Sequence, residues 1–177
     1  MKIDKAIKIA SKELNRSEIK SSLLDAEILL SKVINKDRKF IILNSDKEIN
    51  NQEYEYFKKL IKERLSGKPI AYLTGKKFFW KYEFDISEHV LIPRPDTETI
   101  IELVLKFFKY KNYINFLEIG VGSGCILLSI LKEKKNFQAT GIDISKECIE
   151  ICGINAKKLR DKNRFKFFKS DIDNFTN

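Results

Sequence analysis

The sequence predicts an α/β chain in which a small helical part precedes an alternating strand–helix part. Three observations indicate this fold class. Apolar residues recur at helical spacing through residues 1–66, with no strand pattern. An aromatic-rich segment over 78–86 then partly alternates apolar and polar residues, as β-hairpins do. From residue 114 onward, strand and helix patterns follow each other in β-α-β-α-β order, which requires a parallel sheet with right-handed crossovers.

Two helices are predicted at the start of the chain. The first covers residues 6–14, where the apolar residues fall on one helical face. The second covers residues 19–34, and its apolar stripe is wide enough to pack against two neighbours. Ser17 is the expected N-cap of this second helix.

Two further helices complete a predicted bundle over residues 1–66. Asp37 is expected to cap a short helix, and Asn50 or Asn51 to cap a longer one that ends before Gly67. The pattern places no polar cluster inside this bundle. We therefore expect a module that docks a substrate and does not itself catalyse.

A connector that contains the hairpin is predicted over residues 67–96. Two prolines one residue apart, within Leu91–Glu98, fix an extended backbone. Asp96 or Thr97 can cap the helix that follows, which opens a third segment over 97–177.

The third segment contains the alternating elements, and its first strand is expected to be buried. Helix and strand lengths fit crossover units of a parallel sheet. Strands are expected over 114–119, 137–142 and 165–168, and helices over 125–131 and 146–159.

Composition narrows the function classes. Among 177 residues, 34 basic side chains face 25 acidic ones, for a net charge of +9, but acids and bases are interleaved throughout. A lysine-rich solvated surface is therefore favoured over a nucleic-acid groove, and no direct nucleic-acid binding is expected. No apolar run approaches the roughly 20 residues of a membrane span, and the N-terminus lacks a signal-peptide core, so we expect a soluble, cytoplasmic chain without membrane contact.

The cysteines do not form a disulfide framework. Cys148 and Cys152 are four residues apart on a predicted helix, which could place two metal ligands on one face. The sole histidine, His89, is however distant in sequence. We therefore expect Cys125, Cys148 and Cys152 to be small buried hydrophobic residues, with no metal site.

The residues that indicate a binding function lie at the junction of the first predicted strand and the helix after it. This junction is rich in glycine and has the pattern E-x-G-x-G-x-G from Glu118 to Gly124. Glycines at alternate positions permit a tight turn and a close approach to a ligand, and the helix after them presents unpaired N–H groups. Asp143, at the end of the second strand, can accept both hydroxyls of a ribose. The dinucleotide fingerprint would need glycine in place of Cys125, which disfavours a nicotinamide enzyme.

With Asp143 downstream, the glycine junction resembles the S-adenosylmethionine site of class I methyltransferases. Two upstream segments, Gly67–Gly75 and Leu91–Glu98, are similar to those of the peptide chain release factor glutamine methyltransferases of the HemK type. The resemblance covers the chain from Gly67 onward, and the helical start fits the family's N-terminal bundle. It implies that this chain holds the first half of a Rossmann-like domain, with an incomplete parallel sheet.

The resemblance also implies a reaction, a partner and site residues. The reaction is methyl transfer from S-adenosylmethionine to the side-chain amide nitrogen of the glutamine in the Gly-Gly-Gln motif of class 1 release factors. Glu118 would orient the amino group, Asp143 would hold the ribose hydroxyls, and Asp171 and Ile172 would lie near the adenine. The implied cofactor-binding set is Glu118, Gly120, Val121, Gly122, Ser123, Gly124, Asp143, Asp171 and Ile172. The implied border of the substrate pocket is Pro93, Arg94, Pro95, Asp96, Thr97 and Glu98.

The family's acceptor motif, Asn-Pro-Pro-Tyr, does not occur in the chain. We therefore expect a C-terminally truncated methyltransferase that has no catalytic residue of its own and is inactive alone. Its first strand is expected to keep one unpaired edge, which would make the chain marginally stable or prone to pair with another strand. Two alternatives stay open: a non-catalytic remnant that binds S-adenosylmethionine or a release factor, and a methyltransferase acting on nucleic-acid amino groups.

Overall fold

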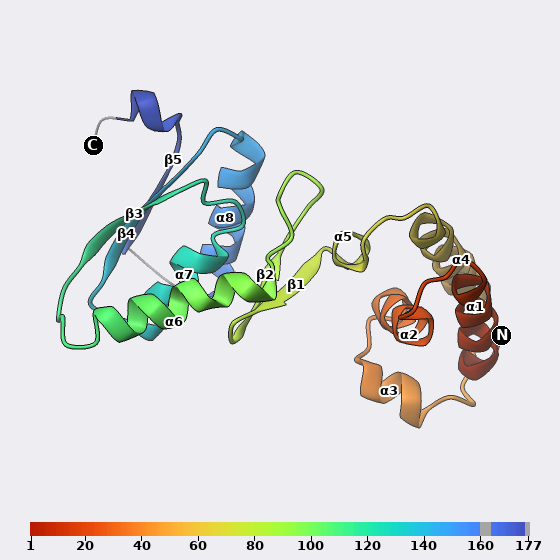
Figure 1. Ribbon diagram of the computed structural model, residues 1–177. Helices are drawn as coiled ribbons and strands as arrows, with labels where there is room; N and C mark the ends of the chain where they lie inside the picture. The colour runs from red at the N-terminus through yellow and green to blue at the C-terminus, as the bar shows by residue number, and fades with distance from the viewer. Residues whose placement is uncertain (160–163, 176–177) are drawn as a thin grey trace. The chain divides into compact units, whose positions relative to one another are not determined.

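The computed structural model describes residues 1–159 and 164–175. The chain forms two compact units, Met1–Thr74 and Gly75–Asn177, and each buries a hydrophobic core of its own (Figure 1). The first unit thus extends beyond the predicted bundle, to Thr74. Among the described residues, no helix is long and apolar enough to cross a membrane.

The first unit is a helical bundle. In its first helix, the apolar residues Ile7, Ala10 and Leu14 recur every three or four positions and are buried against the second and fourth helices. This confirms the predicted helical start of the chain. The helices are α1 (Ile3–Arg16), α2 (Ser22–Val33), α3 (Arg38–Leu43), α4 (Asn51–Leu65) and the short α5 (Ile70–Thr74).

Side-chain caps fix where two of these helices begin. The Asp37 carboxylate accepts a hydrogen bond from the backbone N–H of Phe40 at 2.8 Å, and so starts α3. Asn50 and Glu53 form a reciprocal capping box at the start of α4. Both caps confirm the sequence-based predictions.

Ser17, predicted to cap the second helix, instead ends the first. Its N–H donates to the carbonyl of Leu14 at 3.2 Å, and Glu18 then adopts a left-handed φ of +59°. Helix α2 begins only at Ser22, and Ser21 at its N-cap makes no side-chain capping bond. The prediction was wrong because the chain must complete a left-handed turn before a second helix can start.

A largely buried ion pair ties α2 to α4. Arg64 Nε donates to Asp25 Oδ2 at 2.7 Å, and the two side chains are only 19% and 5% exposed. The same guanidinium donates to the carbonyl of Lys68 at 3.3 Å and so holds the chain that leads into α5. This short helix was not predicted within the connector. It begins directly after Pro69, whose carbonyl accepts the N–H of Leu73 at 3.1 Å.

The second unit combines a hairpin, a parallel sheet and covering helices. The strands β1 and β2 pair antiparallel, and the sheet has the order β3-β4-β5 with parallel pairs. This confirms the predicted β-α-β-α-β order. The elements are β1 (Lys76–Phe79), β2 (Tyr82–Asp85), the 3-10 turn η1 (Pro95–Thr97), α6 (Glu98–Phe107), β3 (Asn115–Ile119), α7 (Cys125–Glu133), β4 (Gln138–Asp143), α8 (Lys146–Lys158), β5 (Phe165–Lys169) and η2 (Ile172–Asn174).

The tight turn of the hairpin is pinned to α6 and α7. Trp80 has a left-handed φ of +55°, as short hairpin turns require. Its backbone N–H donates to the Glu98 carboxylate at 2.8 Å, and its indole N–H donates to Glu133 at 3.0 Å. The cap expected from Asp96 or Thr97 does not form: Thr97 occupies the N-cap position of α6 without a side-chain bond. The start of α6 is instead held by Glu98, which reaches back to the hairpin.

β3 is an edge strand of the described sheet, and within 1–159 and 164–175 only β4 pairs with it. The prediction that this strand is buried was wrong for one face: Leu117 is 42% exposed and Ile119 is 60% exposed. Phe116 packs on the core that also contains Leu127 of α7. Apolar residues on both faces of a strand do not reveal which face is covered, so only the structure could decide this point.

Candidate functional site

A glycine loop joins β3 to α7 at the carboxyl edge of the sheet. Gly120, Gly122 and Gly124 have φ values of +71°, +53° and +76°, in the left-handed region that side chains disfavour. Gly124 also lies against α8, where a Cβ would come within 2.4 Å of Cys152 Sγ. Backbone conformation therefore favours glycine at all three positions, and packing adds a second constraint at Gly124.

Backbone hydrogen bonds hold this loop against the end of β4. The N–H groups of Gly120 and Val121 both donate to the carbonyl of Ile142, at 2.9 and 3.0 Å. The Val121 side chain is buried beneath the loop, and so is Ser123, whose hydroxyl has no hydrogen-bond partner. The loop is thus fixed from below, through its backbone and its buried side chains.

Asp143, the last residue of β4, is the polar centre of this edge. Its Oδ2 accepts from the Gly122 N–H and its Oδ1 from the Ser145 N–H, both at 2.9 Å. One carboxylate therefore joins the glycine loop to the start of α8, where Ser145 is the N-cap. Each carboxylate oxygen has about two lone pairs, so each keeps an acceptor site for a ligand hydroxyl.

Glu118, on β3, carries a buried carboxyl with an unused oxygen. The residue as a whole is half-buried, but its Oε2 is fully covered and has no hydrogen-bond partner. Burial raises the pKa of Glu118 to about 8, because water no longer solvates the charged form. A carboxyl in this condition is suited to a cationic ligand group, which would supply both the missing partner and the compensating charge.

A hollow of about 420 Å³ opens at the carboxyl ends of β4 and β5. The predicted Asp171 lies in its wall, and its carboxylate accepts from the Asp173 N–H at 3.2 Å. Ile172 follows at the start of η2 and is 44% exposed. Sequence reasoning missed Ile144, which is 72% exposed in this wall and comes directly after Asp143, a position that could have indicated it. The lining residues are Ile144, Lys169, Ser170, Asp171 and Asn174.

The proline strip, defined as Pro93–Glu98, belongs to the same compact unit as the glycine loop. Its Glu98 carboxylate is engaged by the Trp80 backbone. The chain just ahead of the strip touches the loop, since Val90 Cγ1 lies 3.8 Å from the position of a Cβ on Gly122. Within the strip Pro93 is buried, Arg94, Pro95 and Asp96 are exposed, and Thr97 and Glu98 are half-buried.

The three cysteines are free and buried, as predicted. Burial raises the pKa of the Cys125 thiol to about 12, and it also raises the pKa values of Cys148 and Cys152. Thiols in this state are poor nucleophiles, so the cysteines pack and do not react. Within 1–159 and 164–175, no group of three or more His, Cys, Asp or Glu could hold a metal ion.

Comparisons with known proteins match both units. The family model described as the PrmC N-terminal domain matches residues 5–75, and the one described as a methyltransferase domain matches residues 110–177. A release factor glutamine methyltransferase of Leptospira interrogans is 38% identical, over 94% of this chain and 59% of that protein. The corresponding protein of Buchnera aphidicola subsp. Acyrthosiphon pisum is 38% identical, over 97% and 60%. A bifunctional methyltransferase of Rickettsia conorii is 35% identical, over 92% and 36%.

The chain thus spans between about a third and three-fifths of the length of these relatives. The match to a methyltransferase domain makes S-adenosylmethionine the cofactor to test against the site. The groups at this edge are compatible with that molecule: Glu118 Oε2 has no hydrogen-bond partner, the Asp143 oxygens keep acceptor sites, and the glycine loop presents backbone without side chains.

Proposed function

We propose that this chain, which matches the PrmC N-terminal domain and a methyltransferase domain, belongs with the release factor glutamine methyltransferases that it resembles and takes part in methylation of the Gly-Gly-Gln glutamine in class 1 release factors. The methyl group goes to the side-chain amide nitrogen of that glutamine. The observation that carries the proposal is the glycine loop held by the Asp143 carboxylate, together with Glu118 on the strand that leads into this loop, whose buried Oε2 has no hydrogen-bond partner.

The residues of this edge divide the cofactor between them. S-adenosylmethionine, when bound, supplies an electrophilic methyl group on a sulfonium centre. In this proposal Glu118 binds the amino group and is ionised by it, because a neighbouring positive charge lowers the pKa of a carboxyl. Asp143 uses its free acceptor sites for the ribose hydroxyls. The hollow beside Ile144 and Asp171 receives the adenine.

The acceptor nitrogen needs help that a cofactor site alone does not give. An amide nitrogen is a poor nucleophile because its lone pair is delocalised into the carbonyl. Transfer therefore depends on aligning the nitrogen with the methyl group and on accepting its N–H hydrogens. We assign the proline strip to the border of this pocket, with buried Pro93 anchoring the exposed Arg94 and Asp96. We do not propose that a residue of the strip accepts the N–H hydrogens of the amide.

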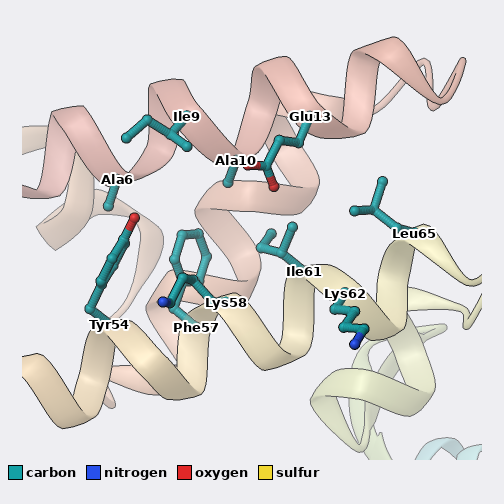
Figure 2. A pocket seen from close by; sticks show the side chains of 10 residues that line it. All are labelled: Ala6, Ile9, Ala10, Glu13, Tyr54, Phe57, Lys58, Ile61, Lys62 and Leu65. Carbon is teal, nitrogen blue, oxygen red and sulfur yellow. The ribbon is translucent and has the colours of Figure 1, made fainter.

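The helical unit is proposed to dock the release factor, through a groove of about 270 Å³ between α1 and α4 (Figure 2). The small side chains of Ala6 and Ala10 on α1 leave the groove open. Figure 2 shows both side chains directed toward α4, where Tyr54, Phe57 and Ile61 form the opposite wall. A groove with such walls accepts an apolar side chain of a partner.

The charges at the rim of this groove indicate which kind of residue lies next to the apolar side chain in the partner. Lys58 and Lys62 line the groove from α4, and Glu13 lines it from α1. Lys58 is itself paired with Glu55 at 2.6 Å, so Lys62 is the rim charge that we expect to complement an acidic residue beside the apolar anchor. We propose that a release factor presents such an acidic, apolar segment to the groove.

The cofactor part of the proposal is tested by calorimetric titration of the chain with S-adenosylmethionine. The expected result is saturable binding that weakens by at least about tenfold in Asp143→Ala, because charge-assisted hydrogen bonds are lost. Glu150→Ala, on the exposed side of α8, is the matched control and should bind like the wild type. Absence of binding by a folded wild-type chain would refute the site.

The substrate part is tested by titrating a labelled class 1 release factor, and separately a nucleic-acid duplex, with the chain. We expect the release factor to bind and the double variant Lys58→Glu/Lys62→Glu to weaken that binding about tenfold or more, since it reverses the rim charge. Lys59→Glu, on the same helix outside the groove, is the matched control. Preferential binding of the duplex would favour a nucleic-acid methyltransferase instead.

A further inference from the structure

We infer that Asn155, on α8, is a positioning residue that fastens the glycine loop to the β1–β2 hairpin and so sets the spacing between the cofactor loop and the chain that leads into the proline strip. This inference rests on the proposed cofactor site. Asn155 lies outside that site, and the proposed function gives it no role in the reaction.

The Asn155 side chain bonds two segments that are far apart in the sequence. Its Oδ1 accepts from the Asp85 N–H at 2.7 Å, and its Nδ2 donates to the Asp85 carbonyl at 2.9 Å. The same Nδ2 donates to the carbonyl of Ser123, in the middle of the glycine loop, also at 2.9 Å. Asn155 is 0% exposed, so these bonds are made in the absence of competing water.

An amide is the group this place requires. The side chain at position 155 must accept one hydrogen bond and donate two. Asparagine is a short, neutral side chain that can do both. A carboxylate would keep the acceptor but lose both donors, and it would face the carbonyls of Asp85 and Ser123 with a negative charge. An apolar side chain of similar size would remove all three hydrogen bonds, and the largest cost would fall on the Ser123 carbonyl, whose bond to Asn155 is fully buried.

Of the two segments that Asn155 joins, one is the glycine loop of the proposed cofactor site, and the other ends the hairpin strand from which the chain continues to the proline strip. Ser123 lies between Gly122, whose N–H is bound by Asp143, and Gly124, which packs against α8. Asp85 ends β2, and the chain then runs on to the proline strip. That run passes the loop closely, since Val90 Cγ1 lies 3.8 Å from the Cβ position of Gly122. A shift at Asn155 would therefore move the loop and this chain relative to each other.

If Asn155 contributes only to stability, its variants should behave differently in cofactor binding than if it positions the loop. If Asn155 only stabilises the fold, a variant lowers the fraction of folded chain, while each folded molecule keeps the wild-type affinity. If Asn155 positions the loop, the dissociation constant of the folded molecules itself rises. A lower folded fraction also raises the apparent dissociation constant, which equals the constant of the folded molecules divided by that fraction. Circular dichroism therefore measures the folded fraction of each variant, and the calorimetric dissociation constant multiplied by that fraction gives the constant of the folded molecules.

The experiment uses the full chain, S-adenosylmethionine, and the variants Asn155→Asp and Asn155→Leu. We expect the dissociation constant of the folded molecules, after correction for the folded fraction, to rise about tenfold in both variants, because one buried hydrogen-bond junction is lost. Lys158→Ala is the matched control. It removes the ion pairs from α8 to Glu83 and Asp85 on the hairpin but leaves the loop junction intact, so it should bind like the wild type.

Amide hydrogen exchange of the wild type supplies a second readout that needs no variant. We expect saturating S-adenosylmethionine to slow exchange over residues 82–86 several-fold, because the ordered loop holds the hairpin through Asn155. An Asn155 variant that retains affinity within twofold overturns the inference, and so does a wild-type hairpin whose exchange is unaffected by a bound cofactor. A folded wild type that binds no S-adenosylmethionine overturns the proposed site and the inference together.

Discussion

Among single residues, Glu118 is the one whose chemistry depends most on its surroundings. Burial raises its pKa to about 8, from the 4.5 of an ordinary glutamate. Because the folded-state pKa lies above the unfolded one, the folded chain holds this proton more tightly. That stabilisation is complete below the unfolded pKa and is lost as the pH rises through the folded pKa. We predict that the melting temperature of the ligand-free chain falls by several degrees as the pH rises from about 4.5 to about 8.

Circular-dichroism melts of the wild type and of Glu118→Gln measure this effect. The glutamine is neutral at every pH, so the variant should lose most of the fall in melting temperature. Glu150→Gln, an exposed carboxyl on α8, should keep the wild-type slope. Equal slopes for Glu118→Gln and the wild type would show that another group causes the pH dependence.

Two glycines of the second unit should respond to alanine in opposite directions. Gly124→Ala places a side chain at φ +76° and a Cβ 2.4 Å from Cys152 Sγ, so we predict a loss of roughly 2–4 kcal/mol of unfolding free energy. Gly153→Ala lies inside α8 with open space around its Cβ position, and should gain about 0.5–1 kcal/mol. Urea unfolding measures both; a Gly124→Ala chain as stable as the wild type contradicts the packing argument.

At the scale of elements, the junction of α2 and α4 depends on one buried ion pair. Asp25 is only 5% exposed, so removal of its partner leaves a nearly buried, uncompensated charge. We predict that Arg64→Met lowers the unfolding free energy of the helical unit by about 3–5 kcal/mol. The same change also frees the Lys68 carbonyl and loosens the entry into α5.

The double variant Asp25→Leu/Arg64→Met distinguishes burial of a lone charge from loss of an attraction. It should recover most of the lost stability, because a packed apolar pair needs no charge compensation. Lys8→Ala, which breaks an exposed pair with Asp4, should leave the unfolding midpoint unchanged. A double variant as unstable as Arg64→Met alone would show that the packing of the arginine stem, and not its charge, matters.

At the scale of the whole molecule, the two units have separate hydrophobic cores, and this predicts separate responses. S-adenosylmethionine should slow amide exchange only in residues 75–177, because a ligand stabilises the unit that binds it. Arg64→Met should speed exchange only in residues 1–74. Exchange measured by mass spectrometry on the intact chain tests both, and cofactor-induced protection spread evenly over the helical unit would contradict the independence of the two cores.

The order of elements could be predicted because it depends on local patterns. Helical spacing, the caps at Asp37 and Asn50, and the β-α-β-α-β alternation are all properties of short stretches of chain. The errors came where a local pattern has two solutions. Ser17 can end one helix or begin the next, and the apolar residues of β3 can be covered on either face. Packing between distant segments decides such cases.

The same division holds for the candidate site. The glycine loop and Asp143 could be predicted, because a left-handed backbone and the end of a strand leave local signatures. The raised pKa of Glu118, the place of Ile144 in the wall of the hollow and the junction at Asn155 required the folded structure. All three depend on burial and on contacts between distant segments: Asn155 bonds Asp85, 70 residues away, and no local pattern predicts such a partner.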